Sequence, residues 1–405
     1  MATRALGING LGRIGKLSVW HHLAHGEFDE LVVNAGRSIG KSLDAVVSYL
    51  ARDSTYGPLH RYLGGMRAER DIRVADADKK ILHVHGKTVR LLMTERDPRK
   101  LPWREHGVRV VVDCTGAFTD PGAPADAPKG SLRGHLAAGA SAVIVSTAFK
   151  SKDKSAETPA DAATLIHGIN HALYDPTTHA VISAASCTTT GLAHMLKPLL
   201  EHKLTARILT AGMSTIHAAT NSQSVLDAVP DAGDSDLRKS RMALSNVILT
   251  STNAAKALEQ VIPQIRSIGF MADSVRIPTP TASLIILNLT VQTELGPDGK
   301  PAIDRALVNR IYSDAAQHEA KGLVRYTEEQ NVSCDMVGED AAIVIEAADT
   351  HTRTGFIELD VPIDGQASRR VRVPVTHIKV FGWYDNELGS YTHQLGALTR
   401  HIARS

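Results

Sequence analysis

Short β-rich runs alternate with helical patterns through the first half of the chain, and this alternation limits the folds that it can adopt. Ala5–Asn9 and Glu30–Asn34 are predicted strands, and Arg13–His25 and residues 41–52 are predicted helices. A strand followed by a helix and a second strand is typical of parallel βαβ units. We therefore expect an α/β protein with an N-terminal doubly wound parallel sheet, whose ligand-binding loops follow the carboxyl ends of the strands.

The pattern changes after about residue 186. The expected strands become longer and often alternate apolar with polar residues, at 206–216, 283–294, 341–346 and 377–384. Such strands favour a mixed or antiparallel sheet, and helices are expected at 192–200, 254–261 and 305–318. We predict a first domain over residues 1–186 and an α+β second domain over residues 187–385.

The composition excludes several classes of protein. Of the 405 residues, 43% are hydrophobic and 22% are charged, which excludes a mainly disordered chain. The net charge is only +2, so no nucleic-acid partner is expected. Neither a membrane-spanning run nor an apolar signal region is visible. The 3 cysteines form no Cys-x-x-Cys pair, and we expect a reduced, cytoplasmic protein.

A glycine-rich segment lies between the first predicted strand and helix. Dinucleotide-binding turns need glycines for the tight turn, for close approach of the pyrophosphate and for packing of the helix, whose N-terminus attracts phosphate. The motif alone is weak, since chance gives about 0.2 matches in such a chain and the alternative is an ordinary tight turn. Its place in the first βα unit favours a cofactor site that includes Gly10, Gly12, Arg13, Ile14 and Gly15.

The second predicted strand bears on the choice of cofactor. An NAD site usually has an acidic residue after this strand for the ribose hydroxyls. Here Ala35 takes that place, and Arg37 and Ser38 follow. A cation and a hydroxyl can bind a 2′-phosphate that a carboxylate would repel, so NADP is favoured over NAD. The alternative is a weakened NAD site with a solvated arginine.

Cys187 and His217 are the candidate catalytic pair. Cys187 lies before a predicted amphipathic helix, whose N-terminus can lower the pKa of a thiol. Buried structural cysteines are commoner, but the surrounding hydroxyl residues argue against an apolar site. His217 directly follows the predicted strand at 206–216, beside a polar run, and is a candidate general base.

The motifs taken together resemble phosphorylating glyceraldehyde-3-phosphate dehydrogenases over essentially the whole chain. The segments that carry the resemblance, in the family's order, are 9–15, 186–189, 215–220, 275–280 and 383–387. Shorter similarities occur at 53–57, 95–98, 115–119 and 168–171. The resemblance implies a Rossmann domain, a catalytic domain with a mixed sheet, and a C-terminal helix at 386–405 that returns to the first domain.

The resemblance also implies an activity. It makes Cys187 the nucleophile that forms a thioester, His217 its base, and Asn386 the group that holds the nicotinamide carboxamide. The implied partners are a phosphorylated aldehyde and inorganic phosphate, in a cytoplasmic homotetramer. Their binding residues by resemblance are Ser186, Thr188, Thr220, Lys239, Arg241, Thr252 and Arg276.

Several positions depart from the family's pattern. Lys239 stands where an arginine is usual, so a bidentate fork becomes a point charge. Asn253 replaces a glycine beside Thr252, which brings a side chain into the expected phosphate pocket. Thr190, Leu388 and Ser390 also differ from the usual residues. Insertions are expected near 120–131, 151–163 and 353–376.

Other functions remain open at this stage. A sister specificity such as erythrose 4-phosphate would use the same cations, and a catalytically silent, regulatory family member is an alternative from another class. Thiol-dependent semialdehyde dehydrogenases would not explain residues 383–387. No metal site is expected, because His21 and His25 lack a third ligand and are read as ordinary surface residues.

Overall fold

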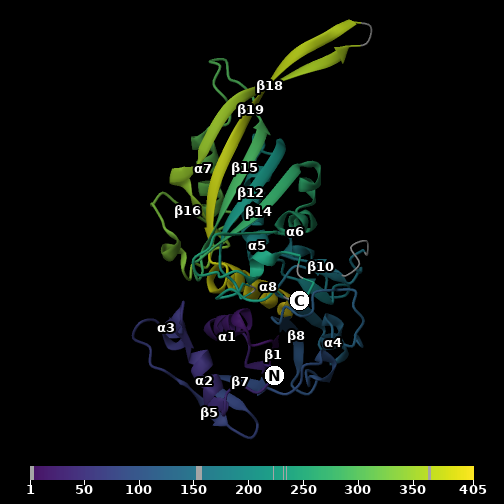
Figure 1. Ribbon diagram of the computed structural model, residues 1–405, viewed down its shortest axis with the longest axis vertical. Coiled ribbons are helices and arrows are strands. Elements are labelled where there is room, and N and C mark those ends of the chain that lie inside the picture. Colours follow the sequence, from purple (N-terminus) through teal and green to yellow (C-terminus); the bar gives the residue numbers. More distant parts are fainter. Residues whose placement is uncertain (1–3, 152–156, 222, 231, 234, 364–365) are drawn as a thin grey trace. The chain divides into compact units, whose positions relative to one another are not determined.

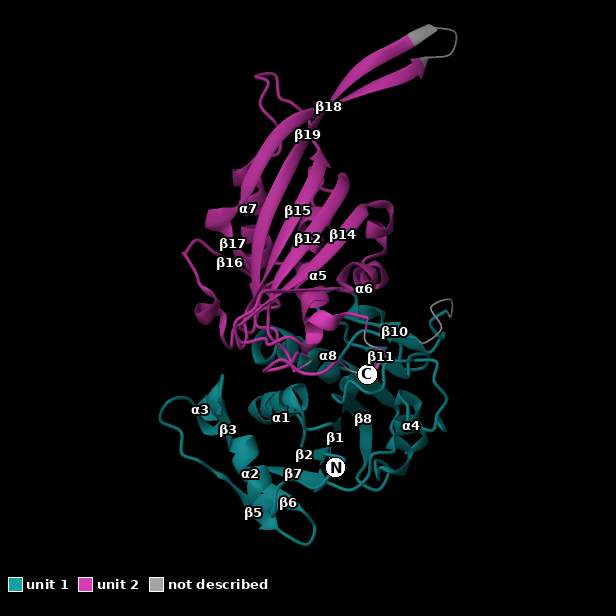
Figure 2. Cartoon of the chain, viewed as in Figure 1, with its two compact units in different colours: residues 1–186, 387–405 teal, residues 187–386 magenta. Residues whose placement is uncertain are grey.

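The chain divides into two compact units, formed by residues 1–186 with 387–405 and by residues 187–386 (Figure 2). The computed structural model describes residues 4–151, 157–221, 223–230, 232–233, 235–363 and 366–405. Part of the predicted insertion at 151–163, residues 152–156, lies outside the described residues. Among the described helices, none has the length and apolar character needed to cross a membrane.

The first unit is built on a nine-stranded sheet with the order β10-β11-β9-β8-β1-β2-β7-β6-β5 (Figure 1). Its strands are β1 (Ala5–Asn9), β2 (Glu30–Asn34), β5 (Ile72–Asp76), β6 (Ile81–Val84), β7 (Lys87–Leu92), β8 (Val108–Asp113), β9 (Ala142–Val145), β10 (Ala162–Thr164) and β11 (Val181–Ser183). The pairings of β5 with β6 and of β6 with β7 are antiparallel, and the other pairings described in this sheet are parallel, which confirms the predicted doubly wound parallel sheet.

The helices of this unit are α1 (Arg13–His25), α2 (Leu43–Ala51), α3 (Leu59–Gly64), α4 (Leu132–Ala137) and α8 (His393–Arg404), and β3 (Arg52–Asp53) pairs with β4 (Gly57–Pro58). Strand side chains alternate between the faces of the sheet. Leu6 and Ile8 therefore join Trp20 of α1 in one apolar cluster, while Val111 joins Trp103 in another. Chain connections diverge from β1 towards β2 and β8, which is where open α/β sheets bind ligands.

The second unit carries an eight-stranded mixed sheet, as predicted. Its core order is β13-β14-β12-β15-β19-β17-β16, and β18 pairs with β19. The strands are β12 (Ile208–Ala218), β13 (Ile248–Thr250), β14 (Gly269–Ile277), β15 (Ser283–Gln292), β16 (Val324–Thr327), β17 (Ile343–Glu346), β18 (His351–Ile363) and β19 (Gln366–Tyr384). The helices are α5 (Cys187–Glu201), α6 (Ala254–Val261) and α7 (Arg305–Gln317).

Alternating burial along β15 fixes which side of this sheet is covered. Every second residue from Ser283 is buried, as period-two side chains require. A hydrogen bond from the Tyr312 hydroxyl of α7 to the Met195 carbonyl of α5 (2.8 Å) joins two of the helices. The sheet and these helices together hold the start of α5 near the ends of β12 and β14.

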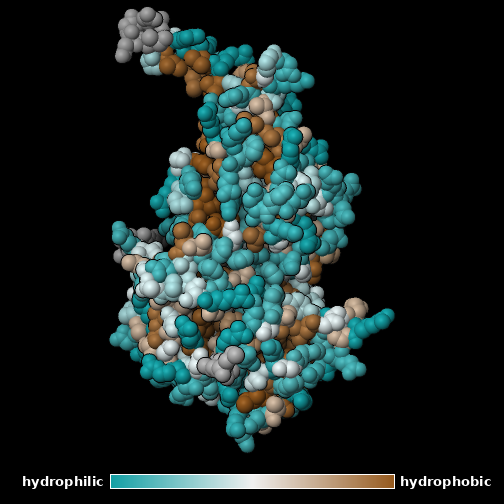
Figure 3. All heavy atoms as spheres, turned by 180° about the vertical axis from the view of Figure 1, so that it is seen from behind, coloured by the Kyte–Doolittle hydropathy of each residue, from teal (hydrophilic) through white to brown (hydrophobic). Residues whose placement is uncertain are grey.

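The expected insertion at 353–376 lies in the antiparallel hairpin of β18 and β19. Cross-strand pairs on one face are apolar, such as Leu359 opposite Val371, while those on the other are charged, such as Glu358 opposite Arg372. Leu359 and Ile357 are exposed, and hydrophobic atoms are visible along the hairpin in Figure 3. Side-chain alternation therefore makes this ribbon amphipathic.

Candidate active site

Three glycines shape the turn between β1 and α1. Gly10 has a φ of +95°, and its N–H donates to the Asn34 carbonyl (2.8 Å). A Cβ on Gly15 would lie 1.8 Å from the Gly10 carbonyl oxygen, whereas a Cβ on Gly12 would meet no atom within 4 Å. Gly10 thus allows the turn, Gly15 allows close packing of α1, and Gly12 leaves open space where a pyrophosphate can approach.

The N-terminus of α1 suits an anion. Gly12 is the N-cap and provides no side-chain cap, and no acidic residue lies in the first turn. The backbone N–H groups of this turn and the positive end of the helix dipole attract phosphate. The predicted residues of this motif, including Ile14, therefore fit a dinucleotide through their backbone.

The side chain of Arg13 has a structural role. Its guanidinium pairs with Asp53 and with Glu387 (2.6 Å), and Lys16 pairs with the same Asp53 carboxylate (3.0 Å). Burial alone would raise the pKa of Asp53, but the hydrogen bonds from Arg13 and Lys16 hold it at about 2. Arg13 can therefore serve a cofactor through its backbone N–H, because its side chain already binds two carboxylates.

The residues predicted to bind the 2′-phosphate of NADP follow β2. Arg37 and Ser38 are exposed, and the Ala35 N–H donates to the Leu92 carbonyl (2.7 Å), which holds the end of β2 against β7. Arg96 donates from Nε to the Gly36 carbonyl (3.0 Å) and adds a second cation to this loop. Arg96 was not predicted, because only the tertiary fold brings its segment beside the end of β2.

Cys187 is the first residue of α5, which begins before the predicted helix at 192–200, and its Sγ lies 3.4 Å from Nε2 of His217. His217 lies at the end of β12, as predicted, and is its penultimate residue because this strand continues beyond residue 216 to Ala218. Ala185, two residues before Cys187, has a φ of +56°, a region that residues other than glycine seldom occupy. Strained backbone of this kind is often found beside functional residues.

Strand register brings Arg276 to His217. The two residues are partners in the parallel pairing of β12 with β14. Nδ1 of His217 can donate to the Ala218 carbonyl (2.8 Å), and in that tautomer the Nε2 lone pair faces the thiol. Arg276 Nη1 donates to the same carbonyl (3.1 Å) and lies 2.5 Å from Nδ1.

The electrostatics of this pair differ from the prediction. Burial raises the pKa of the Cys187 thiol above its ordinary value of 9.0, although the Arg276 cation and backbone N–H groups at the start of α5 act in the opposite direction. Burial, followed by the Arg276 charge, lowers the pKa of His217 to about 3. The expected lowering of the thiol pKa is therefore wrong for this state of the site, because desolvation outweighs the helix terminus. Thiol and imidazole are both neutral at pH 7.

Tyr384 packs near the Cys187–His217 pair. Its hydroxyl shares hydrogen bonds with Thr188 (2.9 Å) and Thr215 (2.8 Å), and its ring centroid is 6.0 Å from that of His217. The Thr188 hydroxyl, predicted to bind phosphate, is thus buried against Tyr384. Residues 383–387 were recognised as a motif, but this packing role of Tyr384 was not predicted.

The remaining predicted anion-binding residues lie in three loops. Lys239 is exposed in a short helical turn, and Arg241 pairs with Asp227 (3.2 Å). The Thr252 hydroxyl accepts from the Ala254 N–H (3.2 Å) at the start of α6. Ser186 ends the first unit, and the Thr220 N–H donates to Gln223 (3.1 Å).

Asn253 and Asn386 have defined conformations. Asn253 has a φ of −96°, so this position makes no demand that only glycine could meet. Asn386 is buried, and its Oδ1 accepts a hydrogen bond from Ser283 (2.9 Å). That bond engages the amide oxygen and orients the amide.

The prediction for His21 and His25 needs correction. His21 is fully buried on α1, and His393 of α8 supplies the third histidine that the local sequence lacked. His21 is therefore not an ordinary surface residue.

Comparison with known proteins gives one consistent result. A family model described as the glyceraldehyde 3-phosphate dehydrogenase NAD binding domain matches residues 4–121, and one described as the C-terminal domain of that enzyme matches residues 186–386. Glyceraldehyde-3-phosphate dehydrogenase 2 of Streptomyces avermitilis is 35% identical to this chain over 398 residues. Glyceraldehyde-3-phosphate dehydrogenase of Geobacillus stearothermophilus is 34% identical to it over 399 residues. Each alignment covers 98% of both chains.

Proposed function

The chain belongs to the glyceraldehyde-3-phosphate dehydrogenase family, and we propose that Cys187 and His217 are the nucleophile and base of that family's reaction. The activity is that of a phosphorylating glyceraldehyde-3-phosphate dehydrogenase, an oxidoreductase that converts the aldehyde and inorganic phosphate to 1,3-bisphosphoglycerate. The observation that carries the proposal is the 3.4 Å contact between Sγ of Cys187 and Nε2 of His217.

The first step is addition of the thiol to the aldehyde. The sulfur attacks the carbonyl carbon, the thiol proton moves to His217 Nε2, and the carbonyl π electrons become an alkoxide. The Cys187 backbone N–H and the new imidazolium stabilise this oxyanion. Because the thiol is neutral at pH 7, His217 takes the proton during the attack, and no ion pair needs to exist beforehand.

A bound nicotinamide cofactor supplies the hydride acceptor that the oxidation to a thioester requires. The glycine turn of residues 10–15 would hold its pyrophosphate, and Asn386 would orient its carboxamide. Inorganic phosphate then attacks the acyl carbon, the C–S bond breaks, and the Cys187 sulfur leaves as thiolate. Arg276 is the cation proposed to hold the reacting phosphate, assisted by Lys239, Thr220 and Thr252 by resemblance.

Substitution of the nucleophile tests this assignment. Cys187→Ser should abolish turnover of glyceraldehyde 3-phosphate while cofactor binding stays near that of the parent, since an alcohol is far harder to ionise than a thiol. Cys334→Ser is the matched control, because Cys334 is exposed and distant in sequence from the motif. Retention of more than a few per cent of activity by Cys187→Ser would remove Cys187 from the mechanism. If the parent protein itself turns over no aldehyde, the result would support the alternative of a catalytically silent family member.

NADP is the cofactor that we propose the chain prefers. Ala35 offers no carboxylate to the ribose, while Arg37, Ser38 and Arg96 are exposed in or beside the loop after β2. A charge-assisted hydrogen bond to the 2′-phosphate contributes about 1.5–3 kcal/mol, which corresponds to an affinity about 10- to 100-fold higher for NADP. Titration of both cofactors checks this, and Ala35→Asp with Arg37→Leu should reverse the order. Equal affinities, or tighter binding of NAD, would contradict it.

Erythrose 4-phosphate is the alternative substrate, because the same cations can hold any terminal phosphate. Rates with the two aldehydes in competition separate the specificities. We also propose a cytoplasmic homotetramer, by resemblance to the family, and light scattering on the purified protein tests the assembly.

A further inference from the structure

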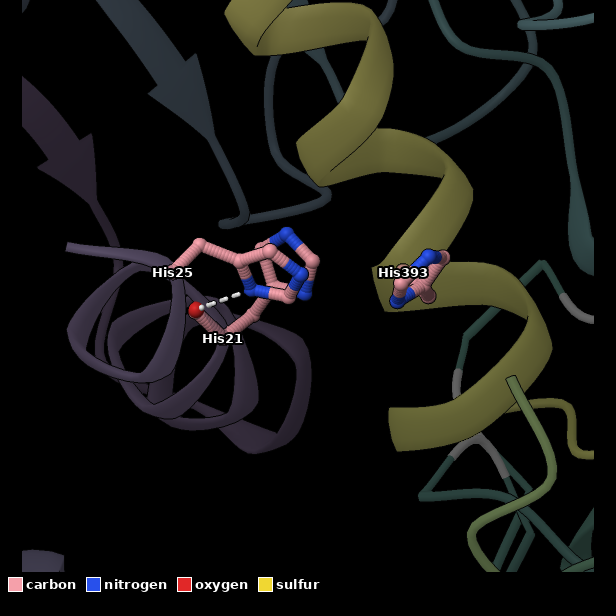
Figure 4. Close-up of side chains that lie close together, drawn as sticks. All are labelled: His21, His25 and His393. Carbon is pink, nitrogen blue, oxygen red and sulfur yellow. Dashed lines mark hydrogen bonds between the residues drawn. The ribbon is translucent and has the colours of Figure 1, made fainter. Parts of the chain in front are cut away.

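Three histidines from distant parts of the sequence meet in the first unit. His21 and His25 lie one turn apart on α1, and His393 begins α8 (Figure 4). One ring nitrogen from each lies within 4.8 Å of the other two. We propose that this three-histidine cluster binds a first-row transition dication such as Zn²⁺ and thereby clamps α8 to α1.

The donor set selects the type of metal. Three neutral imidazoles without a carboxylate suit Zn²⁺, Ni²⁺ or Cu²⁺, whereas Mg²⁺ and Ca²⁺ need oxygen ligands. Water is the expected fourth ligand at a three-histidine site.

His25 has the hydrogen bond that metal-binding histidines commonly make. Its Nδ1 bonds to the His21 carbonyl (2.9 Å), drawn as the dashed line in Figure 4, which requires the proton on Nδ1. The Nε2 lone pair is then available, and the carbonyl fixes both tautomer and ring orientation. The His25 ring stacks on that of His21, with centroids 4.1 Å apart.

The Nε2 edge of His21 faces α8. A Cβ on Gly396 would lie 2.0 Å from this nitrogen, so only glycine leaves room for the ring. His393, Gly396 and Arg400 are spaced i, i+3 and i+7, and therefore share one face of α8. Nε2 thus points to the face that carries the third histidine.

Arg400 competes with a metal for this nitrogen. Its Nη1 donates to His21 Nε2 (2.9 Å), which leaves the Nδ1 of His21 buried and without a partner among the described residues. Arg400 Nε is also paired with Glu27 (3.1 Å). A metal at Nε2 would displace the Nη1 group, while Glu27 would keep the guanidinium neutralised nearby.

Closure of the site needs only small movements. Tetrahedral Zn–N bonds of about 2.1 Å place two ligand nitrogens about 3.4 Å apart. The cluster therefore has to contract by at most about 1.4 Å from the present 4.8 Å limit. His25 is exposed and His393 half-buried, so rotation of these two side chains can supply the movement.

Calorimetric titration with Zn²⁺ tests the site in full-length protein carrying Cys187→Ser, which removes a competing thiol. The parent should bind one Zn²⁺ per chain at this site, and His25→Gln and His393→Gln should each weaken that binding at least about 100-fold. His401→Gln, on the same helix, is the matched control and should bind as the parent does. Arg400→Leu should bind Zn²⁺ more tightly than the parent, because its competitor is gone, and Glu27 keeps Arg404 as a partner (3.5 Å).

Thermal unfolding gives an independent readout of the clamp. Zn²⁺ should raise the melting temperature of the parent and of His401→Gln, but not that of His393→Gln, and a chelator should reverse the rise. Circular dichroism confirms that each variant is folded before titration. The proposal is overturned if the parent shows no saturable Zn²⁺ binding, if His25→Gln and His393→Gln bind like the parent, or if His401→Gln loses the site. Unchanged or weaker binding by Arg400→Leu would overturn the competition.

Discussion

Replacement of His217 by asparagine separates two accounts of how the thiol becomes reactive. In one, a thiolate–imidazolium pair exists before substrate arrives; in the other, His217 takes the proton during attack. Burial raises the pKa of Cys187 above 9.0 and lowers that of His217 to about 3, which favours the second account. Asparagine keeps a polar side chain of similar length but cannot accept the proton at Nε2.

The size of the effect follows from the thiol pKa. A group with a pKa above 9.0 is less than about 1% ionised at pH 7, so a variant without the base loses at least about 10²-fold in rate there. The thiolate fraction rises about tenfold per pH unit below the pKa. The deficit of His217→Asn should therefore shrink about tenfold per unit between pH 7 and pH 9.

Steady-state rates of parent and variant over this range, with saturating cofactor and phosphate, measure the ratio directly. Alkylation of Cys187 by iodoacetamide in the absence of substrate provides the thiol pKa in the same buffers. His179→Asn, a histidine of the first unit outside the motif, controls for nonspecific effects. A ratio that is constant across the range, together with full alkylation at pH 7, would show that the thiolate is already formed and would refute this reasoning.

Arg276→Leu should raise the KM for the aldehyde and also weaken the dependence of the rate on phosphate, because this one cation is proposed to serve the reacting phosphate. Steady-state kinetics at varied phosphate concentrations check this. Unchanged constants would exclude Arg276 from the site. Acid should destabilise the second unit through His217, whose folded pKa is about 3, since the unfolded chain binds a proton below its pKa of 6.5. Stability is complete above pH 6.5 and falls as the pH drops, by about 2 kcal/mol at pH 5. Urea unfolding at pH 7.5 and 5 should show a loss of stability that is smaller by about 2 kcal/mol in His217→Asn than in the parent.

Local patterns predicted the elements that position the site, but not all of its contacts. Cys187 before a helix and His217 at the end of β12 were visible in short windows of sequence. The register of β12 with β14, which sets Arg276 against His217, depends on pairing between strands about 60 residues apart and has no local signal. Only a family resemblance brought Arg276 into consideration.

The errors have a common physical origin in burial. The start of α5 was expected to lower the thiol pKa, as a helix terminus in water would, but tertiary packing around Tyr384 removes solvent from the pair. The same packing engages the hydroxyl of Thr188. His21 was read as a surface residue because its partner His393 lies at the other end of the chain. Desolvation depends on contacts between distant segments, which sequence periodicity does not report.

Arg13 and Arg276 differ in the partners of their guanidinium groups, and this difference makes Arg276 the better candidate to bind a phosphate. Arg13 has two carboxylate partners, Asp53 and Glu387, which compensate its charge and fix its position. Arg276 is partly buried, and burial lowers its pKa, yet within the described residues it contacts an imidazole and a carbonyl and forms no ion pair with a carboxylate. A desolvated cation without an anionic partner is costly in a folded chain, and such local costs are found where function requires them. A phosphate bound at Arg276 would supply the missing negative charge, which supports the proposal that this residue holds the phosphate that reacts at Cys187.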